Sequence, residues 1–278
     1  AVEGNRFSLG IQTSNDFSRN LWISLFGAYG AKDKEWKYGG DITWIQRKTP
    51  RIEWYGSHQK DIEQLGMMGF FDQGNVFNTA LSLEGEQDQL SMITSSEASV
   101  MIESGSGLST FIEMRHRKVD PKGSLEFPLP QNPDGSESIT TAESTLQLRY
   151  AHQEKFVSGA FERVSLGSRA PILTFTTTQG WKGLAGSQFR YGRYTLGLEG
   201  KLRWGPLGRV EWTAEGGMYS GTAPFPLMEL QPANETALSI QPAFNLLRYF
   251  EFVTDRWVRA GFEWHGEGAI LGHIPLIR

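Results

Sequence analysis

The chain contains 278 residues, with 27 lysines and arginines, 31 aspartates and glutamates, and a formal net charge of -4. This balance predicts no basic surface for nucleic acid, and the absence of cysteine excludes disulfides, a thiol nucleophile and a cysteine-ligated metal. No segment approaches the roughly 20 consecutive apolar residues of a transmembrane helix, so a helical membrane protein is excluded.

Alternation of apolar and polar residues predicts β-strands through the first half of the chain, because a strand turns successive side chains to opposite faces. The predicted strands are Arg6–Ser14, Leu21–Tyr29, Trp36–Arg47, Arg51–Asp61, Met92–Glu103, Leu108–Lys118 and Thr140–His152. Two segments lose the alternation: Gln64–Leu90, with clustered methionines and glycines, and Val119–Ser138, with several prolines. We expect both to be long loops.

The second half of the chain repeats the alternation more regularly. Strands are predicted over Arg193–Trp204, Arg209–Met218 and Arg256–Gly266, with a short turn at Gly205–Gly208. In the first of these strands, Tyr194 and Trp204 bracket one apolar face at a separation of about ten residues, which is the length that a tilted membrane-spanning strand needs.

These patterns predict an all-β fold, an antiparallel transmembrane β-barrel with about 12–14 strands in this chain and long extracellular loops. The composition agrees, with 32 Gly, 9 Trp, 8 Tyr and 17 Phe, because membrane barrels are rich in glycine and interfacial aromatic residues. Short turns alternate with long loops along the chain, as they do between the two sides of a membrane barrel. We expect a single domain over residues 1–278. A soluble β-sandwich shows the same alternation and stays open as the alternative.

The stretch Thr222–Arg256 lies between two strand patterns and contains four prolines, which prevent it from forming a strand in the barrel wall. Its apolar side chains need burial, so we predict a loop that folds into the lumen. The predicted lumen-loop residues are Pro224, Phe225, Pro226, Leu227, Asn234 and Glu235. A surface cap that only seals the barrel is the alternative.

Charged residues on the polar faces of the strands predict an interior lined by ion pairs. The predicted lumen charge network consists of Glu113, Arg115, Arg149, Glu199, Arg203, Glu211, Glu215, Arg259 and Glu263. Carboxylates that alternate with arginines on neighbouring strands neutralise one another, which is the arrangement expected in a water-filled barrel. We therefore predict a structural role for these carboxylates and no catalytic residues.

Sequence motifs for other chemistries are missing. The five histidines are scattered, with no HExxH spacing, so no metal site is predicted. The chain has no GxSxG elbow, and its glycine-rich pieces have no lysine–serine end that would make a phosphate loop. We expect no cofactor and no enzymatic activity.

Several longer segments resemble a known family. In the second half these are APFPLMELQPANET, AFNLLRYFEFVTDRWVRAGFEWHGEG and GHIPLIR, and near the start they are VEGNRFSLGIQT and DIEQLG. They are similar to a Bacteroidota outer-membrane barrel family of uncharacterised function, whose members carry a carboxypeptidase-regulatory-like domain before the barrel and are grouped with BamA-like and surface-antigen barrels. The resemblance implies a barrel of about 16 strands, so this chain is expected to lack the periplasmic domain and the last strands.

The same resemblance implies an outer loop that folds back into the lumen, and a non-enzymatic role in assembling or translocating outer-membrane proteins. The implied location is the bacterial outer membrane, and the implied partners are the lipid bilayer with its lipopolysaccharide and other outer-membrane proteins. A structural or binding subunit of a larger outer-membrane complex is the alternative. A hydrolase that assembles its catalytic residues from distant strands is the third hypothesis.

Overall fold

The computed structural model describes residues 3–63, 89–123, 138–159, 163–223, 227–230 and 252–266. Most of these residues lie in β-strands, which confirms the predicted all-β fold. Two single turns of 3-10 helix, η1 (Leu184–Gly186) and η2 (Gly205–Leu207), are the helical elements of this part of the chain. None of the described helices is long and apolar enough to cross a membrane.

The described residues contain a single large sheet of 11 antiparallel strands. Each strand pairs with the next strand of this sheet, so that β7 pairs with β10 and β12 pairs with β15. The strands are β1 (Arg6–Gln12), β2 (Leu21–Gly30), β3 (Trp36–Lys48), β4 (Arg51–Glu63), β5 (Gln89–Glu103), β6 (Leu108–Gly123), β7 (Ile139–Tyr150), β10 (Ile172–Gly180), β11 (Tyr191–Arg203), β12 (Arg209–Gly221) and β15 (Arg256–His265). Two short pairs lie outside it: β8 (Lys155–Ser158) with β9 (Arg163–Gly167), and β13 (Glu229–Leu230) with β14 (Val253–Thr254).

The predicted loop Val119–Ser138 begins too early, because β6 continues through Pro121 to Gly123. The last pair between β6 and β7 is Val119 with Ile139, so Pro121 lies beyond β7 and faces β5 alone, opposite Ser91. Proline is tolerated at such a one-sided position, where the strand has an edge. A proline in the sequence therefore marks the end of the neighbouring strand here, and β6 itself continues.

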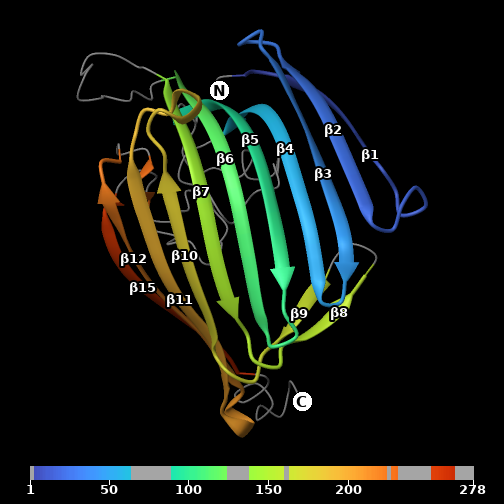
Figure 1. The fold of residues 1–278 in the computed structure, drawn as a ribbon, viewed down its shortest axis with the longest axis vertical. Coiled ribbons are helices and arrows are strands. Elements are labelled where there is room, and N and C mark those ends of the chain that lie inside the picture. The colour runs from blue at the N-terminus through green and yellow to red at the C-terminus, as the bar shows by residue number, and fades with distance from the viewer. Residues whose placement is uncertain are drawn as a thin grey trace, which may run out of the picture.

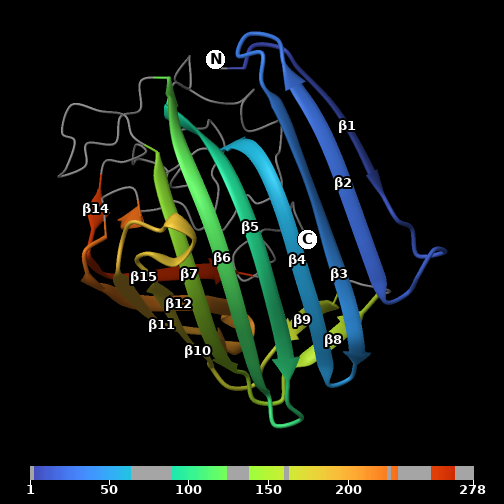
Figure 2. The same ribbon diagram turned by 45° about the horizontal axis from the view of Figure 1, so that its top comes forward.

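The sheet curls into an open, barrel-like shape (Figure 1). Figure 2 shows β10, β11, β12 and β15 turned across behind β4–β7. One ion pair confirms the curvature: Arg6 of β1 contacts Asp61 of β4 at 2.7 Å, although the two strands are three places apart in the sheet. Neighbouring strands are about 4.8 Å apart, so a flat sheet would separate these backbones by roughly 14 Å. The polar face that carries Arg6 and Asp61 is therefore the concave one, called the inner wall below.

The outward face is apolar over its middle and aromatic near both ends. On β11, for example, Leu196 and Leu198 are 51% and 39% exposed, and both point away from the inner wall. Near one end of the sheet the outward aromatic residues are Tyr29, Trp36, Tyr38 and Tyr194, and near the other end they are Trp44, Trp54, Tyr150, Trp204 and Trp264. These two rows are called the aromatic belts below.

The connections differ between the two ends of the sheet. At the short-turn rim, tight turns join β3 to β4, β5 to β6 and β11 to β12. At the long-loop rim, residues 64–88, 124–138 and 222–255 join β4 to β5, β6 to β7 and β12 to β15. The short-turn rim also carries the β8–β9 hairpin, which the sequence patterns did not predict.

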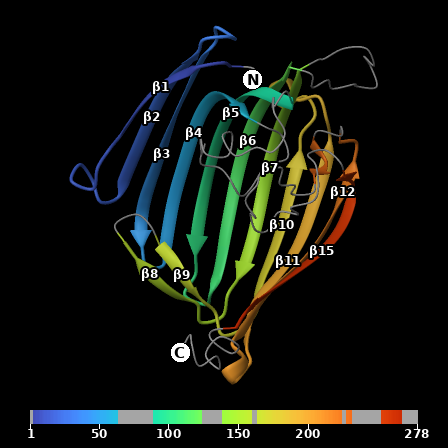
Figure 3. The ribbon, with the colours of Figure 1, turned by 180° about the vertical axis from the view of Figure 1, so that it is seen from behind.

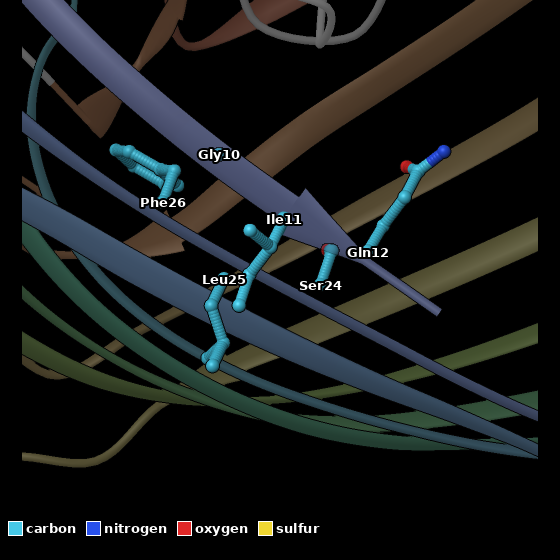
Figure 4. A pocket seen from close by; sticks show the side chains of 6 residues that line it. All are labelled: Gly10, Ile11, Gln12, Ser24, Leu25 and Phe26. Atoms are coloured by element: carbon cyan, nitrogen blue, oxygen red, sulfur yellow. The ribbon is translucent and has the colours of Figure 1, made fainter. Parts of the chain in front are cut away.

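The two edge strands, β1 and β15, are the first and the last of 11 antiparallel strands. Because neighbouring strands alternate in direction, both edge strands run from the long-loop rim to the short-turn rim. A direct pairing of β1 with β15 would therefore be parallel, and among the described residues neither edge has a further strand partner. A groove over the paired strands β1 and β2 is lined by Gly10, Ile11, Gln12, Ser24, Leu25 and Phe26 (Figure 4). In the described residues the barrel is thus open.

A hydrophobic cluster lies on the inner wall close to the long-loop rim. It contains Ile93, Val119, Ile139, Phe189, Tyr191 and Ala223. Leu227 and Met228, from the connection between β12 and β15, pack against it. The core of the protein is therefore formed between the wall and a segment that folds onto it.

Aromatic rings on the inner wall lie over glycines of the neighbouring strand. The indole of Trp257 on β15 covers Gly217 on β12, and a Cβ atom at Gly217 would overlap the ring. We expect Gly217→Val to displace Trp257 and to destabilise the fold by about 1–3 kcal/mol, the usual range for overpacking. The measurement is the Tm of the purified protein in detergent. Gly27→Val is the control, because nothing lies within 4 Å of a Cβ atom at Gly27; equal losses in both variants would contradict the prediction.

Candidate functional site on the inner wall

A buried carboxylate fixes the connection between β12 and β15 to the inner wall. Glu229 is 7% exposed. One carboxylate oxygen accepts a hydrogen bond from Arg193 on β11 at 2.6 Å, and the other lies 3.1 Å from Arg259 on β15. The two arginines come from the strands on either side of β12, so one side chain of the connection bridges β11 and β15. These three residues are called the Glu229 clamp.

Aromatic and acidic neighbours hold both arginines in place. Arg259 donates a hydrogen bond to Glu215 at 2.5 Å, and the indole of Trp257 donates to the same carboxylate oxygen at 3.0 Å. The guanidinium of Arg193 lies 5.8 Å from the ring centre of Tyr219 and 5.4 Å from that of Trp257. Cations over aromatic faces are attracted by the ring quadrupole, so the clamp is already shaped for a carboxylate.

Two backbone contacts extend the attachment beyond Glu229. The hydroxyl of Tyr219 donates to the carbonyl oxygen of Leu227 at 2.8 Å. Glu229 and Leu230 pair with Thr254 and Val253, so the two ends of the connection are joined to each other as β13 and β14. Anchoring at both ends limits how far this connection can move from the wall.

The structure describes one of the six predicted lumen-loop residues. Leu227 is half-buried and packs on the inner cluster, whereas Pro224, Phe225, Pro226, Asn234 and Glu235 lie outside the described residues. The anchor itself, Glu229, was not predicted. A signal for it exists in the sequence, because Glu229 is the single charged residue between Glu215 and Glu235, and a lone charge in an apolar, proline-rich segment needs a partner when that segment is buried.

The predicted lumen charges all lie on the polar face of their strands, but they form separate groups. Arg115 contacts Glu113 and Glu97, both at 2.8 Å. Arg149 lies 4.0 Å from Glu199. The remaining groups are Glu211 with Lys201 and Arg209, Glu215 with Arg259, and Glu263 with His265; Arg203 is exposed at the end of β11. A single continuous network over these residues is not observed among the described contacts, although some pairs reach past a neighbouring strand, as Arg149 on β7 does to Glu199 on β11.

A more deeply buried charged group was missing from the predicted network. Glu143 on β7 accepts hydrogen bonds from Arg117 on β6 at 3.4 Å and from the hydroxyl of Tyr191 on β11. All three side chains are nearly inaccessible to solvent. The alternation of β7 places Glu143 on the inner face, so the sequence could have identified it. Its partner Tyr191 comes from β11, two places away in the sheet, so strand order had to bring the two side chains together.

A second attachment lies at the short-turn rim, at the base of the β8–β9 hairpin. The carboxylate of Glu154 accepts two hydrogen bonds from the guanidinium of Arg149, at 2.6 and 2.8 Å, and one from the hydroxyl of Ser165 at 2.5 Å. The hydrogen bond from Arg149 is the main cause of the lowered pKa of Glu154, and Ser165 lowers this pKa further. The charged form of Glu154 is therefore the one that the folded protein stabilises.

The geometry of the inner wall can hold charged segments of the chain. Within the described ranges no group of three or more histidine, aspartate or glutamate side chains is arranged to hold a metal ion. The carboxylates of Glu229, Glu113, Glu199, Glu211 and Glu215 each lie within 4.0 Å of a lysine or arginine side chain.

More than half of the chain matches a known protein family. Residues 109–278 match the family described as "Family of unknown function (DUF5686) C-terminal domain". The chain belongs to the DUF5686 family. This confirms the resemblance noted in the sequence at the level of a family of unknown function, while the organism group and the regulatory-like domain stay predictions. The Glu229 clamp and the β8–β9 hairpin both lie within the matched residues.

A solved structure similar to the DUF5686 chain is the crystal structure of BamA from Haemophilus ducreyi lacking POTRA domains 1–3. The TM-score is 0.48 at 11% sequence identity, and the match covers 84% of this chain. The chain spans 42% of the length of that BamA chain. No curated protein matches the sequence.

We expect Glu229→Gln to loosen the connection between β12 and β15. The amide keeps the shape of the side chain but loses its charge, so Arg193 and Arg259 lose the anion that they share. Breaking a buried ion pair costs about 3–5 kcal/mol. Because both arginines are partly exposed, we expect a cost near the lower end of this range. The measurement uses a Leu227→Cys variant of this cysteine-free chain and follows its rate of maleimide labelling, which Glu229→Gln should raise. Glu263→Gln, at an exposed ion pair, is the control. Equal labelling rates in both backgrounds would contradict the clamp.

The hairpin base should respond to acid. Because the folded pKa of Glu154 is below its unfolded value, the stabilisation by Glu154 is complete above the unfolded pKa of about 4.3 and is lost as the pH falls through the folded pKa. We expect Glu154→Gln to lower Tm at pH 7, and the difference from the parent protein to shrink as the pH falls below about 4. Thermal unfolding at a series of pH values measures this. A difference that is unchanged at pH 3 would show that the charge of Glu154 is irrelevant.

Proposed function

We propose that this protein is an integral outer-membrane β-barrel protein of the bacterial envelope. The observation that carries the proposal is the pair of aromatic belts on the outward face, with an apolar surface between them. Membrane barrels have an apolar outer band flanked by aromatic girdles and a polar interior. A soluble β-sandwich would bury its apolar face against a second sheet, whereas here the concave polar face is the one that is covered.

The spacing of the belts fits a bilayer. Tyr194 and Trp204 stand on the outward side of β11, ten positions apart. At about 3.3 Å per residue and a tilt near 40°, this separation spans roughly 25 Å along the membrane normal. That value equals the height of the apolar band of outer-membrane barrels, about 25 Å. We assign the short-turn rim to the periplasm and the long-loop rim to the outside.

The open edges require further strands. In lipid, unpaired backbone groups of an edge strand have no water to bind, and each costs several kcal/mol. Since β1 and β15 run in the same direction, an odd number of strands from outside the described residues must lie between them in an antiparallel barrel. The total is then even, as in bacterial single-chain barrels.

Within the envelope we propose a non-enzymatic role in assembling or translocating outer-membrane proteins. Two features support it: the wall carboxylates lie beside cations, and a segment of the chain is clamped inside the wall, where contacts could be regulated without covalent chemistry. The BamA-like resemblance of the sequence motifs supports the same role. The proposed partners are the lipid bilayer with lipopolysaccharide and other outer-membrane proteins. A subunit of a larger complex is the second candidate, favoured by the two open edges of the sheet.

The membrane assignment is tested by cysteine labelling in intact cells, which the cysteine-free chain makes clean. Ser106→Cys lies in a tight turn at the short-turn rim, and Lys182→Cys lies on the β10–β11 connection at the long-loop rim. We expect an impermeant maleimide to label position 182 in intact cells and position 106 only after the outer membrane is opened. Labelling of both sites only after complete lysis, with the protein in the soluble fraction, would refute the proposal.

The cellular role is tested by depletion. We expect the amounts of other outer-membrane proteins to fall after this protein is depleted, and re-expression of the parent chain to restore them. Glu263→Gln should restore them equally well, since that ion pair is exposed. Unchanged levels with a stable complex recovered from mild detergent would favour the subunit role instead.

A further inference from the structure

The β8–β9 hairpin crosses the concave side of the sheet at the short-turn rim. It starts and ends in the connection between β7 and β10 and extends toward the ends of β3–β5 (Figures 1 and 3). Its far contact is an ion pair between Arg163 on β9 and Glu103 at the end of β5, at 2.5 Å. The hairpin thus reaches from one part of the rim to another across the interior side of the wall.

The contact with β5 is built as a latch. Glu103 also accepts a hydrogen bond from the backbone N–H of Arg51 at 3.1 Å, which fixes the carboxylate at the start of β4. The guanidinium of Arg163 lies 3.5 Å from the centre of the Phe156 ring on β8, so one cation joins both strands of the hairpin to the wall. The side chains of Arg163 and Glu103 are 18% and 16% exposed.

Hydrogen bonds of its own fix the base of the hairpin. Glu154 binds Arg149 and Ser165 as described above, and the hydroxyl of Ser168 donates to the carbonyl oxygen of His152 at 2.5 Å. These contacts close the loop where the chain leaves β7 and returns to β10. A segment with a fixed base and a single latch at its far side can turn about the base when the latch opens.

The hairpin has little else to hold it against the wall. Among the described residues, β8 and β9 pair only with each other. The face with Val157, Val164 and Leu166 is exposed, at 57%, 59% and 62%. Because an isolated two-stranded hairpin is marginally stable in water, its position depends on the contacts at its base and at Glu103.

We propose that the β8–β9 hairpin is a lid over the short-turn end of the barrel interior, held closed by the Arg163–Glu103 latch. This inference rests on the proposed function, in which that interior connects with the periplasm. When the latch opens, the lid turns about its base and admits larger molecules to the inner wall.

The experiment measures access to the inner wall in the purified full chain. Thr174→Cys places a thiol on the inner face of β10 near the short-turn rim. We compare its labelling by a small maleimide and by a maleimide carrying a bulky polymer. Arg163→Gln removes the latch, and Glu263→Gln, at an ion pair remote from the hairpin, is the matched control. We expect Arg163→Gln to raise the rate with the bulky reagent several-fold and to leave the rate with the small reagent nearly unchanged.

A second variant separates opening from unfolding. Arg163→Lys keeps a positive charge opposite Glu103, so in the Thr174→Cys background it should restore the slow parent rate with the bulky reagent. A bulky-reagent rate in Arg163→Gln equal to the parent rate, or a rate in Arg163→Lys as high as in Arg163→Gln, would overturn the lid. A rise with both reagents in Arg163→Gln would also overturn it, because that result indicates unfolding. These rates are measured in detergent, so failure of the membrane assignment appears separately, in the labelling of whole cells.

Discussion

Each strand of the sheet turns one set of side chains toward the concave face and the other set outward, and the antiparallel ladder holds this division from β1 to β15. The rest of the structure depends on it, because a slip of one residue in any pair would place a strand's apolar residues among the charges. The aromatic belts, the ion pairs of the inner wall and the curvature that brings Arg6 to Asp61 all follow from the same register.

Charge on the inner wall acts through short contacts between strands and between the wall and the segments that fold onto it. Arginines at the wall are costly to leave without an anion once the interior is covered, and Glu229 supplies one from a segment outside the sheet. At the opposite rim the roles are exchanged: Glu103 is the anion on the wall, and Arg163 of the hairpin is the cation that binds it. In both places an ion pair attaches an irregular segment to a regular sheet.

These two attachments differ in how firmly they hold. The segment at Glu229 is also packed on the hydrophobic cluster through Leu227 and Met228, so burial and charge act together there. The β8–β9 hairpin keeps an exposed apolar face and is attached by polar contacts alone. Low local stability is typical of segments that move during function. Within the described residues, the segment at Glu229 is therefore the more firmly attached of the two, and the β8–β9 hairpin is the one suited to change.

The sequence by itself determined ten of the eleven strands of the sheet, their inward and outward faces and the alternation of short turns with long loops, because apolar and polar residues alternate with a period of two along each strand. It did not yield β10 or the β8–β9 hairpin, whose threonine-rich and glycine-interrupted segments alternate weakly. The partners of the charges were decided only by the tertiary structure. Glu229, Arg193 and Arg259 are far apart in the chain, and Arg163 and Glu103 are separated by 60 residues, so curvature and strand order had to bring them together before any ion pair existed.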